Sequence, residues 1–380
     1  MKRIISVTTG TRADYGLLRP LLHLISKSTK LELKLIVAGM HLSKKHGMTI
    51  NEIKKDGFKI NGLVKMIPLH NYPFDMSIAL GNGIIGFSRI FKKIKPDINL
   101  VLGDRDEALA SSLAASHMNI VNAHIHGGER THGIDEYNRH AITKISNIHF
   151  AVTKNSKERI LKLGENPKFV KFTGSPSIDE IRLGNFKNKQ FLEKKYDLNL
   201  NEINFLLVYH PVTTEFQKSK SQIKNILEEL IVFKRKILAI APNSDAGNKE
   251  IFNNLKLFSK NYPFLKIFPN IPRTDYLGLL KNQIILVGNS SSGIIEASYF
   301  GTPVINIGMR QDGREKSDNV IDCKNSKINI KNSINHAIKL KNKTYVNTKI
   351  YGNGHASEKI LQTLENIKLD EKIIQKQIHY

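Results

Sequence analysis

The 380 residues exceed what one hydrophobic core usually organises, and 40% hydrophobic with 24% charged residues excludes wholesale disorder, so two folded domains are expected. No apolar run approaches the about 20 residues that cross a bilayer, and the lone Cys323 excludes an internal disulfide framework, which predicts a cytoplasmic protein with no membrane partner. The net charge of +24 comes from scattered lysines without an aromatic platform between them, so no nucleic-acid partner is predicted.

Short runs rich in Ile, Val and Leu alternate with amphipathic stretches, which is typical of βα units on a parallel sheet. In the first half we expect helices at Tyr15–Ser26 and Ala108–Ser116, and strands at Ile4–Thr8, Leu33–Val37, Ile98–Leu102, Ile120–His124 and Ile148–Val152. Turn residues at 172–176 precede a charged helix, so the crossing to a second domain is expected shortly after them. The alternation then restarts, with strands expected at Phe205–Tyr209, Ile237–Ala241, Leu265–Phe268, Ile284–Val287 and Val304–Ile307. This pattern predicts an α/β fold of two Rossmann-like domains facing a cleft, with residues 1–175 in the first and 176–354 in the second.

Polar clusters follow many of these strands, where ligands bind in open α/β sheets. The clusters are Thr9–Arg12, Gly103–Arg105, His126–Glu129, His210–Pro211, Asn243–Gly247 and Gly288–Gly293. Because they fall on one rim of the predicted sheets, they indicate an active-site cleft.

The segment Gly288–Gly293 leaves a strand and opens a helix, so its N–H groups and the hydroxyls of Ser290 and Ser291 could hold a phosphate. An ordinary helix cap is the alternative. Glu296 could reach ribose hydroxyls or could simply complement the helix dipole. Arg310 follows the next strand and suits phosphate oxygens, with a surface ion pair as the alternative.

Titratable groups gather after the first-domain strands. Asp104 is a candidate acid or base, although an Asp in such a turn can also be a helix cap. The stretch from His126 and Glu129 to Asp135 and Arg139 lacks a recognised helical metal-ligand spacing, so no metal site is predicted. Asp135 and Arg139 are four residues apart and could form an ion pair on one helix face. In the second domain, His210 is either a cleft residue or a satisfied structural histidine.

These motifs resemble the UDP-N-acetylglucosamine 2-epimerase family, and within it the hydrolysing branch of bacterial sialic-acid synthesis. The likeness covers nearly the whole chain and rests on 11–15, 103–105, 124–129, Asp135 with 139–144, 210–214, 289–291 and 304–308.

The resemblance implies a glycosyltransferase-B-like pair of domains, with the C-terminal segment 355–380, including a helix near Ala356–Leu369, packing back on the first domain. It implies that UDP is held by Arg12, Ser290, Ser291, Glu296 and Arg310, that Arg105 assists, that Asn243 belongs to the cleft wall, and that Asp104, Asp135, Arg139 and His210 surround the sugar. His126 and Glu129 join the candidate catalytic residues. The resemblance extends to the epimerase half of the bifunctional animal enzyme, which has a glutamate at the position of His126. Bacterial hydrolysing relatives share His-Gly-Gly-Glu, so His126 either transfers a proton or shapes the pocket. The resemblance further implies a homodimer without a cofactor.

The family chemistry removes the C2 proton, eliminates UDP and hydrates the resulting glycal. The expected substrate is UDP-N-acetylglucosamine, and the expected products are N-acetylmannosamine and UDP. The nearest alternative is UDP-2,4-diacetamido-2,4,6-trideoxyglucose, which feeds legionaminic acid by the same chemistry. A non-hydrolysing epimerase, a glycosyltransferase and a binding-only module are the remaining alternatives.

Overall fold

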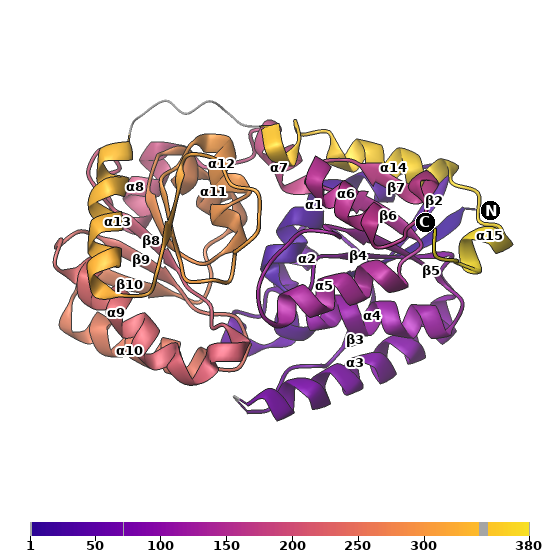
Figure 1. The fold of residues 1–380 in the computed structure, drawn as a ribbon, viewed down its shortest axis with the longest axis horizontal. Helices are drawn as coiled ribbons and strands as arrows, with labels where there is room; N and C mark the ends of the chain where they lie inside the picture. The colour runs from indigo at the N-terminus through magenta and orange to yellow at the C-terminus, as the bar shows by residue number, and fades with distance from the viewer. Residues whose placement is uncertain (1, 71, 342–348, 380) are drawn as a thin grey trace.

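A computed structural model describes residues 2–70, 72–341 and 349–379 of the chain. They form two α/β lobes that lie side by side (Figure 1), each built around one parallel sheet. Within these described ranges, no helix combines the length and the apolar character that a membrane crossing needs.

The first lobe contains a seven-stranded sheet in the order β3-β2-β1-β4-β5-β6-β7. Its strands are β1 (Arg3–Thr9), β2 (Leu31–Ala38), β3 (Ile60–Val64), β4 (Ile98–Leu102), β5 (Val121–Ile125), β6 (Ile148–Ala151) and β7 (Val170–Phe172). The helices between them are α1 (Arg12–Lys27), α2 (Ile50–Lys55), α3 (Pro73–Ile94), α4 (Asp106–His117), α5 (Ile134–Ile145) and α6 (Lys154–Lys162). All pairings are parallel, as the near-continuous apolar strands predict.

The second lobe contains a six-stranded parallel sheet in the order β10-β9-β8-β11-β12-β13. Its strands are β8 (Phe205–Val208), β9 (Ile237–Ile240), β10 (Leu265–Phe268), β11 (Ile285–Gly288), β12 (Val304–Ile307) and β13 (Val320–Cys323). The accompanying helices are α8 (Lys189–Tyr196), α9 (Ser219–Ile231), α10 (Asn248–Asn261), α11 (Arg273–Lys281), α12 (Glu296–Phe300) and α13 (Lys327–Leu340).

Each sheet is covered by apolar helix faces on both sides. In the first lobe, Leu18 and Leu22 of α1 are fully buried against strand residues such as Val7 and Leu100. In the second, Ile226 of α9 is buried in the core with Phe205 of β8. Burying a side chain of this size stabilises the fold by about 1.5–3 kcal/mol. The buried helix faces therefore hold the strands in place, including the strand ends that face the cleft.

The chain passes between the lobes after α7 (Pro176–Arg182), which packs against α1. The C-terminal helix α14 (Ala356–Asn366) lies on the first lobe beside α1 and α7 (Figure 1). Asp179 of α7 accepts hydrogen bonds from the first N–H groups of α14, at Ala356 (2.9 Å) and Ser357 (2.6 Å). The last helix, α15 (Glu371–Ile374), is followed by Lys376, which pairs with Glu165 at 2.6 Å. The C-terminal segment is thereby anchored to the first lobe.

Candidate active site

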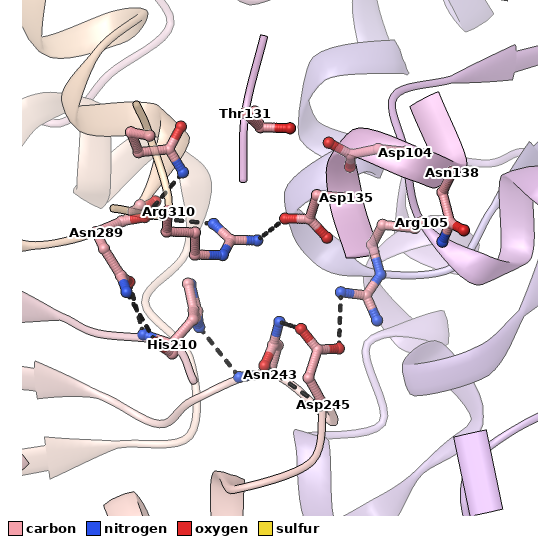
Figure 2. A network of polar contacts seen from close by, with 12 residues as sticks. Asp104, Arg105, Thr131, Asp135, Asn138, His210, Asn243, Asp245, Asn289 and Arg310 are labelled. Atoms are coloured by element: carbon pink, nitrogen blue, oxygen red, sulfur yellow. Dashed lines mark hydrogen bonds and ion pairs between the residues drawn. The ribbon is translucent and has the colours of Figure 1, made fainter. Parts of the chain in front are cut away.

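The strand order of each sheet changes direction between two strands, β1 and β4 in the first and β8 and β11 in the second. The carboxyl ends of these strands open into a cavity of about 220 Å³ that residues of both lobes line. Ligands of open α/β sheets bind at such a position. The predicted site residues that line it are Arg12, Asp104, Arg105, His210, Asn243, Ser290, Ser291 and Arg310. Figure 2 shows side chains from the two lobes converging on this space.

His210 is fixed by the strand ends around it. Its backbone N–H donates to Asn289 Oδ1, and Asn289 Nδ2 donates back to its carbonyl oxygen, both at 2.8 Å. Its Nδ1 accepts from the N–H of Asn243 at 3.2 Å. Burial, with Arg310 and Arg105 nearby, lowers the pKa of His210 to about 3. The ring is therefore neutral at physiological pH, and Nε2 has the proton because Nδ1 is an acceptor.

An ion pair joins the two lobes across the cleft. Arg310 Nη2 lies 2.7 Å from Asp135 Oδ2, and Arg310 Nη1 donates to the carbonyl oxygen of Asn289 at 3.3 Å (Figure 2). The alternative pair between Asp135 and Arg139 is wrong, although both are on α5, because Arg139 turns into the protein interior. Arg310 is therefore a cleft residue and not a surface ion pair.

Asp104 pairs with Arg139, whose side chain is only 1% exposed. Burial, together with the nearby Arg314 and Arg310, lowers the pKa of Arg139. Its Nη1 also donates to the carbonyl oxygen of His126 at 2.8 Å. The helix-cap alternative for Asp104 is not observed, since the residue at the N-cap of α4 is Arg105. The carboxylate instead lines the cavity, supported from behind by a buried guanidinium.

His126 lies behind the cavity wall and is not among its lining residues. It is 3% exposed, its Nδ1 is 2.7 Å from Glu129 Oε2, and its Nε2 is 3.0 Å from Ser175 Oγ. Glu129 is also buried, and Arg139 and Arg314 lie 3.6 and 3.5 Å from its carboxylate. Burial alone would raise the pKa of Glu129, but Arg314 and His126 lower it overall. These residues form a charged layer that supports Arg139.

Arg105 extends toward the second lobe within a cluster of acidic side chains. Its Nε donates to Glu107 Oε2 at 3.2 Å, and its Nη1 lies 3.5 Å from Asp245 Oδ1. Burial lowers the pKa of Arg105, but Glu107 and Asp245 raise it overall. Gly39, at φ +55°, packs against this carboxylate: a Cβ there would lie 2.0 Å from Glu107 Oε1, so a side chain at this position would displace Glu107. The sequence analysis did not identify Glu107 or Asp245, although Asp245 belongs to the predicted 243–247 cluster.

The predicted phosphate segment lines the cavity opposite α1. Ser290 caps the short turn Ser291–Gly293, with its Oγ accepting from Ser292 N at 3.3 Å, so both the cap and the cavity position are observed. Gly288 has φ +140°, and a Cβ there would meet the Val208 carbonyl oxygen at 1.9 Å, so only glycine fits. On the facing lobe, burial lowers the pKa of Arg12, and its Nη1 is buried without a hydrogen-bond partner in the part of the chain that is described.

Glu296 is not among the lining residues of this cavity. Its carboxylate accepts from Arg273 Nη1 at 2.8 Å, and Arg273 Nε donates to Glu180 at 2.9 Å. Arg273 follows β10, and its position after a strand was the sequence signal that could have identified it.

The residues that the structure describes contain no group of three or more His, Cys, Asp or Glu side chains arranged to hold a metal ion.

The neutral buried histidines predict an acid-sensitive fold. Burial lowers the pKa of both His210 and His124 to about 3, against an ordinary value of 6.5. The unfolded chain therefore takes up protons near pH 6.5, while the folded chain does not until about pH 3. The free energy of unfolding should fall as the pH decreases through this window, by up to about 1.4 kcal/mol per pH unit for each histidine. Thermal unfolding followed by circular dichroism should show Tm decreasing from about pH 6.5 to about pH 4; a constant Tm would contradict this account.

Comparison with known proteins places this geometry in a family. The sequence model of the family described as UDP-N-acetylglucosamine 2-epimerase matches residues 23–365. A "UDP-N,N'-diacetylbacillosamine 2-epimerase (hydrolyzing)" of Legionella pneumophila is 37% identical over 376 residues, which are 99% of each chain. A polysialic acid biosynthesis protein of Escherichia coli is 37% identical over 88% of this chain and 86% of its own. A UDP-N-acetylglucosamine 2-epimerase of Neisseria meningitidis is 34% identical over 90% of this chain and 88% of its own.

Solved structures confirm the predicted fold. The crystal structure of a Neisseria meningitidis UDP-GlcNAc 2-epimerase bound to UDP-GlcNAc has a TM-score of 0.79 at 22% identity, covering 95% of this chain and 99% of that one. A Methanocaldococcus jannaschii enzyme in complex with UDP-GlcNAc and UDP has a TM-score of 0.77 at 21% identity, with the same coverage. The pair of Rossmann-like domains is thus the architecture of the relatives. As the motifs predicted, the chain belongs to the UDP-N-acetylglucosamine 2-epimerase family.

Proposed function

We propose that this protein is a hydrolysing 2-epimerase of UDP-2-acetamido sugars, with UDP-N,N'-diacetylbacillosamine as its preferred substrate. This compound is the UDP-2,4-diacetamido-2,4,6-trideoxyglucose of the sequence analysis. The main support for the reaction is one arrangement: the carboxylate of Asp104 and the neutral imidazole of His210 line a cavity whose other groups suit a diphosphate. Asp135 is not among the lining residues, but it is held 2.7 Å from Arg310, which is.

In this proposal the diphosphate lies between Ser290, Ser291 and Arg310 of the second lobe and Arg12 of the first. The unpartnered Nη1 of Arg12 supports this placement, because a buried guanidinium nitrogen gains most from an anionic ligand. Asn243 and Arg105 form the adjacent cavity wall. Glu296 does not line the cavity and its Oε1 accepts from Arg273, so we assign it a supporting position beside the nucleotide.

The first half of the reaction is an anti elimination. A carboxylate, Asp104 or Asp135, takes the proton from C2, the C2–H electrons form the C1=C2 double bond, and the C1–O electron pair leaves with UDP. Arg310 and the Nε2–H of His210 offset the charge that develops on the leaving oxygen. A neutral imidazole can do this as a hydrogen-bond donor without transferring its proton.

The second half hydrates the glycal. The hydroxyl of a water molecule adds to C1, and a proton adds to C2 from the face opposite to the one that lost it. The product is a free sugar with inverted C2. His126 and Glu129 lie too deep to touch the sugar, so we propose that they position Arg139, which in turn orients Asp104.

Sequence similarity supports the choice of sugar. The Legionella relative that matches over 99% of both chains is described as acting on UDP-N,N'-diacetylbacillosamine, whereas the UDP-N-acetylglucosamine relative matches over 90% of this chain. UDP-N-acetylglucosamine, with N-acetylmannosamine as product, remains the second candidate because of that relative.

Steady-state assays with both substrates test this proposal. UDP release measured with a coupled enzyme, and the free sugar identified by proton NMR, should show a kcat/KM at least about 10-fold higher for UDP-N,N'-diacetylbacillosamine. Epimerisation without UDP release would contradict hydrolysis. An equal or higher kcat/KM for UDP-N-acetylglucosamine would contradict the substrate choice and leave the reaction class intact.

A further inference from the structure

A second cavity, of about 370 Å³, is lined by residues that lie next to those of the active site in the sequence. It lies between the first turns of α3 and α5 and the segment that follows His210, so both lobes line it. The two lobes approach each other beside this cavity, since a Cβ on Gly133 would lie 3.5 Å from Thr213 Oγ1.

Three residues of the proposed reaction site have a near neighbour in this cavity. Asp106 follows Asp104 by two positions, Ile134 directly precedes Asp135, and Thr213 follows His210 by three positions. The first cavity includes Arg310, and the second includes the residues beside Asp135. The ion pair between Asp135 and Arg310 (Figure 2) therefore links a residue that lines the first cavity to the direct neighbour of a residue that lines the second.

The lining of the second cavity is mostly apolar. Met76 and Leu80 come from α3, and Ile134 and Tyr137 from α5. Its polar lining residues are Ser77, Asp106, Asn138, Thr213 and Thr214. Asn138 Nδ2 donates to Asp106 Oδ1 at 2.9 Å, which orients both side chains, and Thr213 lines the cavity from the second lobe.

This lining matches one part of the proposed substrate. A sugar that binds through its C1 diphosphate directs C4 and C6 away from the phosphates. In UDP-N,N'-diacetylbacillosamine these carbons have an acetamido group and a methyl group, which together offer two methyls, one N–H and one carbonyl. In UDP-N-acetylglucosamine the same carbons have hydroxyl groups. In this cavity the hydroxyls would lose their hydrogen bonds to water, and the apolar side chains would have no apolar group of the sugar to contact.

We infer that this second cavity, lined by Met76, Ile134 and Asp106, is the subsite for the C4 acetamido and C6 methyl groups and selects the trideoxy sugar. The inference rests on the proposed function. Met76 and Ile134 contact the two methyl groups, and the Asp106–Asn138 pair and Thr213 bind the amide.

Substitution of Met76 by Gln tests the subsite, because it keeps the length of the side chain and removes its apolar end. The matched control is Ile78→Gln, on the same helix, at a side chain that is 51% exposed and outside the cavity lining. Met76→Gln should lower kcat/KM for UDP-N,N'-diacetylbacillosamine about 10-fold and change that for UDP-N-acetylglucosamine less than about 2-fold. Ile78→Gln should change neither value.

A matched pair of ligands makes the test independent of one variant. The analogue with a free 4-amino group differs from UDP-N,N'-diacetylbacillosamine only in the acetyl group. The wild-type protein should turn it over at least about 10-fold less efficiently, and Met76→Gln should reduce that difference.

Several outcomes would overturn the inference. Equal losses on all substrates, or a change in oligomeric state by size-exclusion chromatography, would assign Met76 to general stability or to a subunit contact. No loss in Met76→Gln would show that Met76 does not bind the sugar. Failure of the proposed function looks different, because the wild-type protein would then release no UDP from any of the three sugars.

Discussion

Substitution of Asp135 by Asn is expected to lower kcat by about 100- to 10,000-fold, which is the range for removal of a positioned acid or base. The amide keeps the shape of the side chain, but it can neither take a proton from C2 nor neutralise Arg310 across the cleft. KM should change less, because Arg310, released from this ion pair, can still bind the diphosphate. The measurement is steady-state UDP release under saturating substrate.

The matched control for Asp135→Asn is Glu136→Gln on the same helix. Glu136 accepts from Thr131 N at 2.6 Å and pairs with His140, and it lies outside the lining of the first cavity. This variant should retain kcat within about 3-fold. If both variants lost activity equally, the role of Asp135 would be to stabilise the start of α5 and not to act on the substrate.

Substitution of His210 by Asn should lower kcat by about 100- to 1,000-fold, the usual cost of removing one donor to a developing oxyanion. The Asn oxygen can still accept the N–H of Asn243, so the strand end should keep its shape while the Nε2–H donor is lost. His140→Asn, on the partly exposed α5 surface, is the control and should leave kcat unchanged.

The pH profile distinguishes a donor from a titrating acid at this position. The pKa of His210 is about 3, against an ordinary histidine value of 6.5. The pH profiles of kcat for the wild-type protein and for His210→Asn should therefore have the same shape near pH 6.5. A step near that value in the wild-type protein, absent from the variant, would mean that His210 titrates during turnover and would contradict the neutral-donor assignment.

The regular βα pattern made much of the fold predictable from sequence. Central strands such as β4 and β8 are buried on both faces, so their apolar runs stand out. The edge strands β3, β7 and β13 were not predicted, because β3 contains Asn61 and Gly62, β7 has only three residues, and all are partly exposed. The positions of Arg12, Asp104 and His210 followed from the rule that ligands bind at strand ends.

The orientation of turn residues was beyond sequence reasoning. His126 has φ +68°, an uncommon conformation for a residue other than glycine, and its ring is directed toward the buried Glu129 and Ser175 instead of the cleft. Helical spacing suggested that Arg139 pairs with Asp135. In the folded protein Arg139 instead pairs with Asp104, and Asp135 pairs with Arg310. The first pair is set by packing within the first lobe and the second by the relative placement of the two lobes, and local sequence patterns encode neither.

Turnover of UDP-N,N'-diacetylbacillosamine in deuterated water, with the free sugar analysed by proton NMR and mass spectrometry, tests the central claim most directly. The account predicts UDP and a free sugar with inverted C2 and one deuterium at C2 in every product molecule, because each turnover removes the C2 proton and returns one from solvent. A released sugar that retains its original C2 hydrogen, or an epimerised sugar that is still attached to UDP, would contradict elimination followed by hydration.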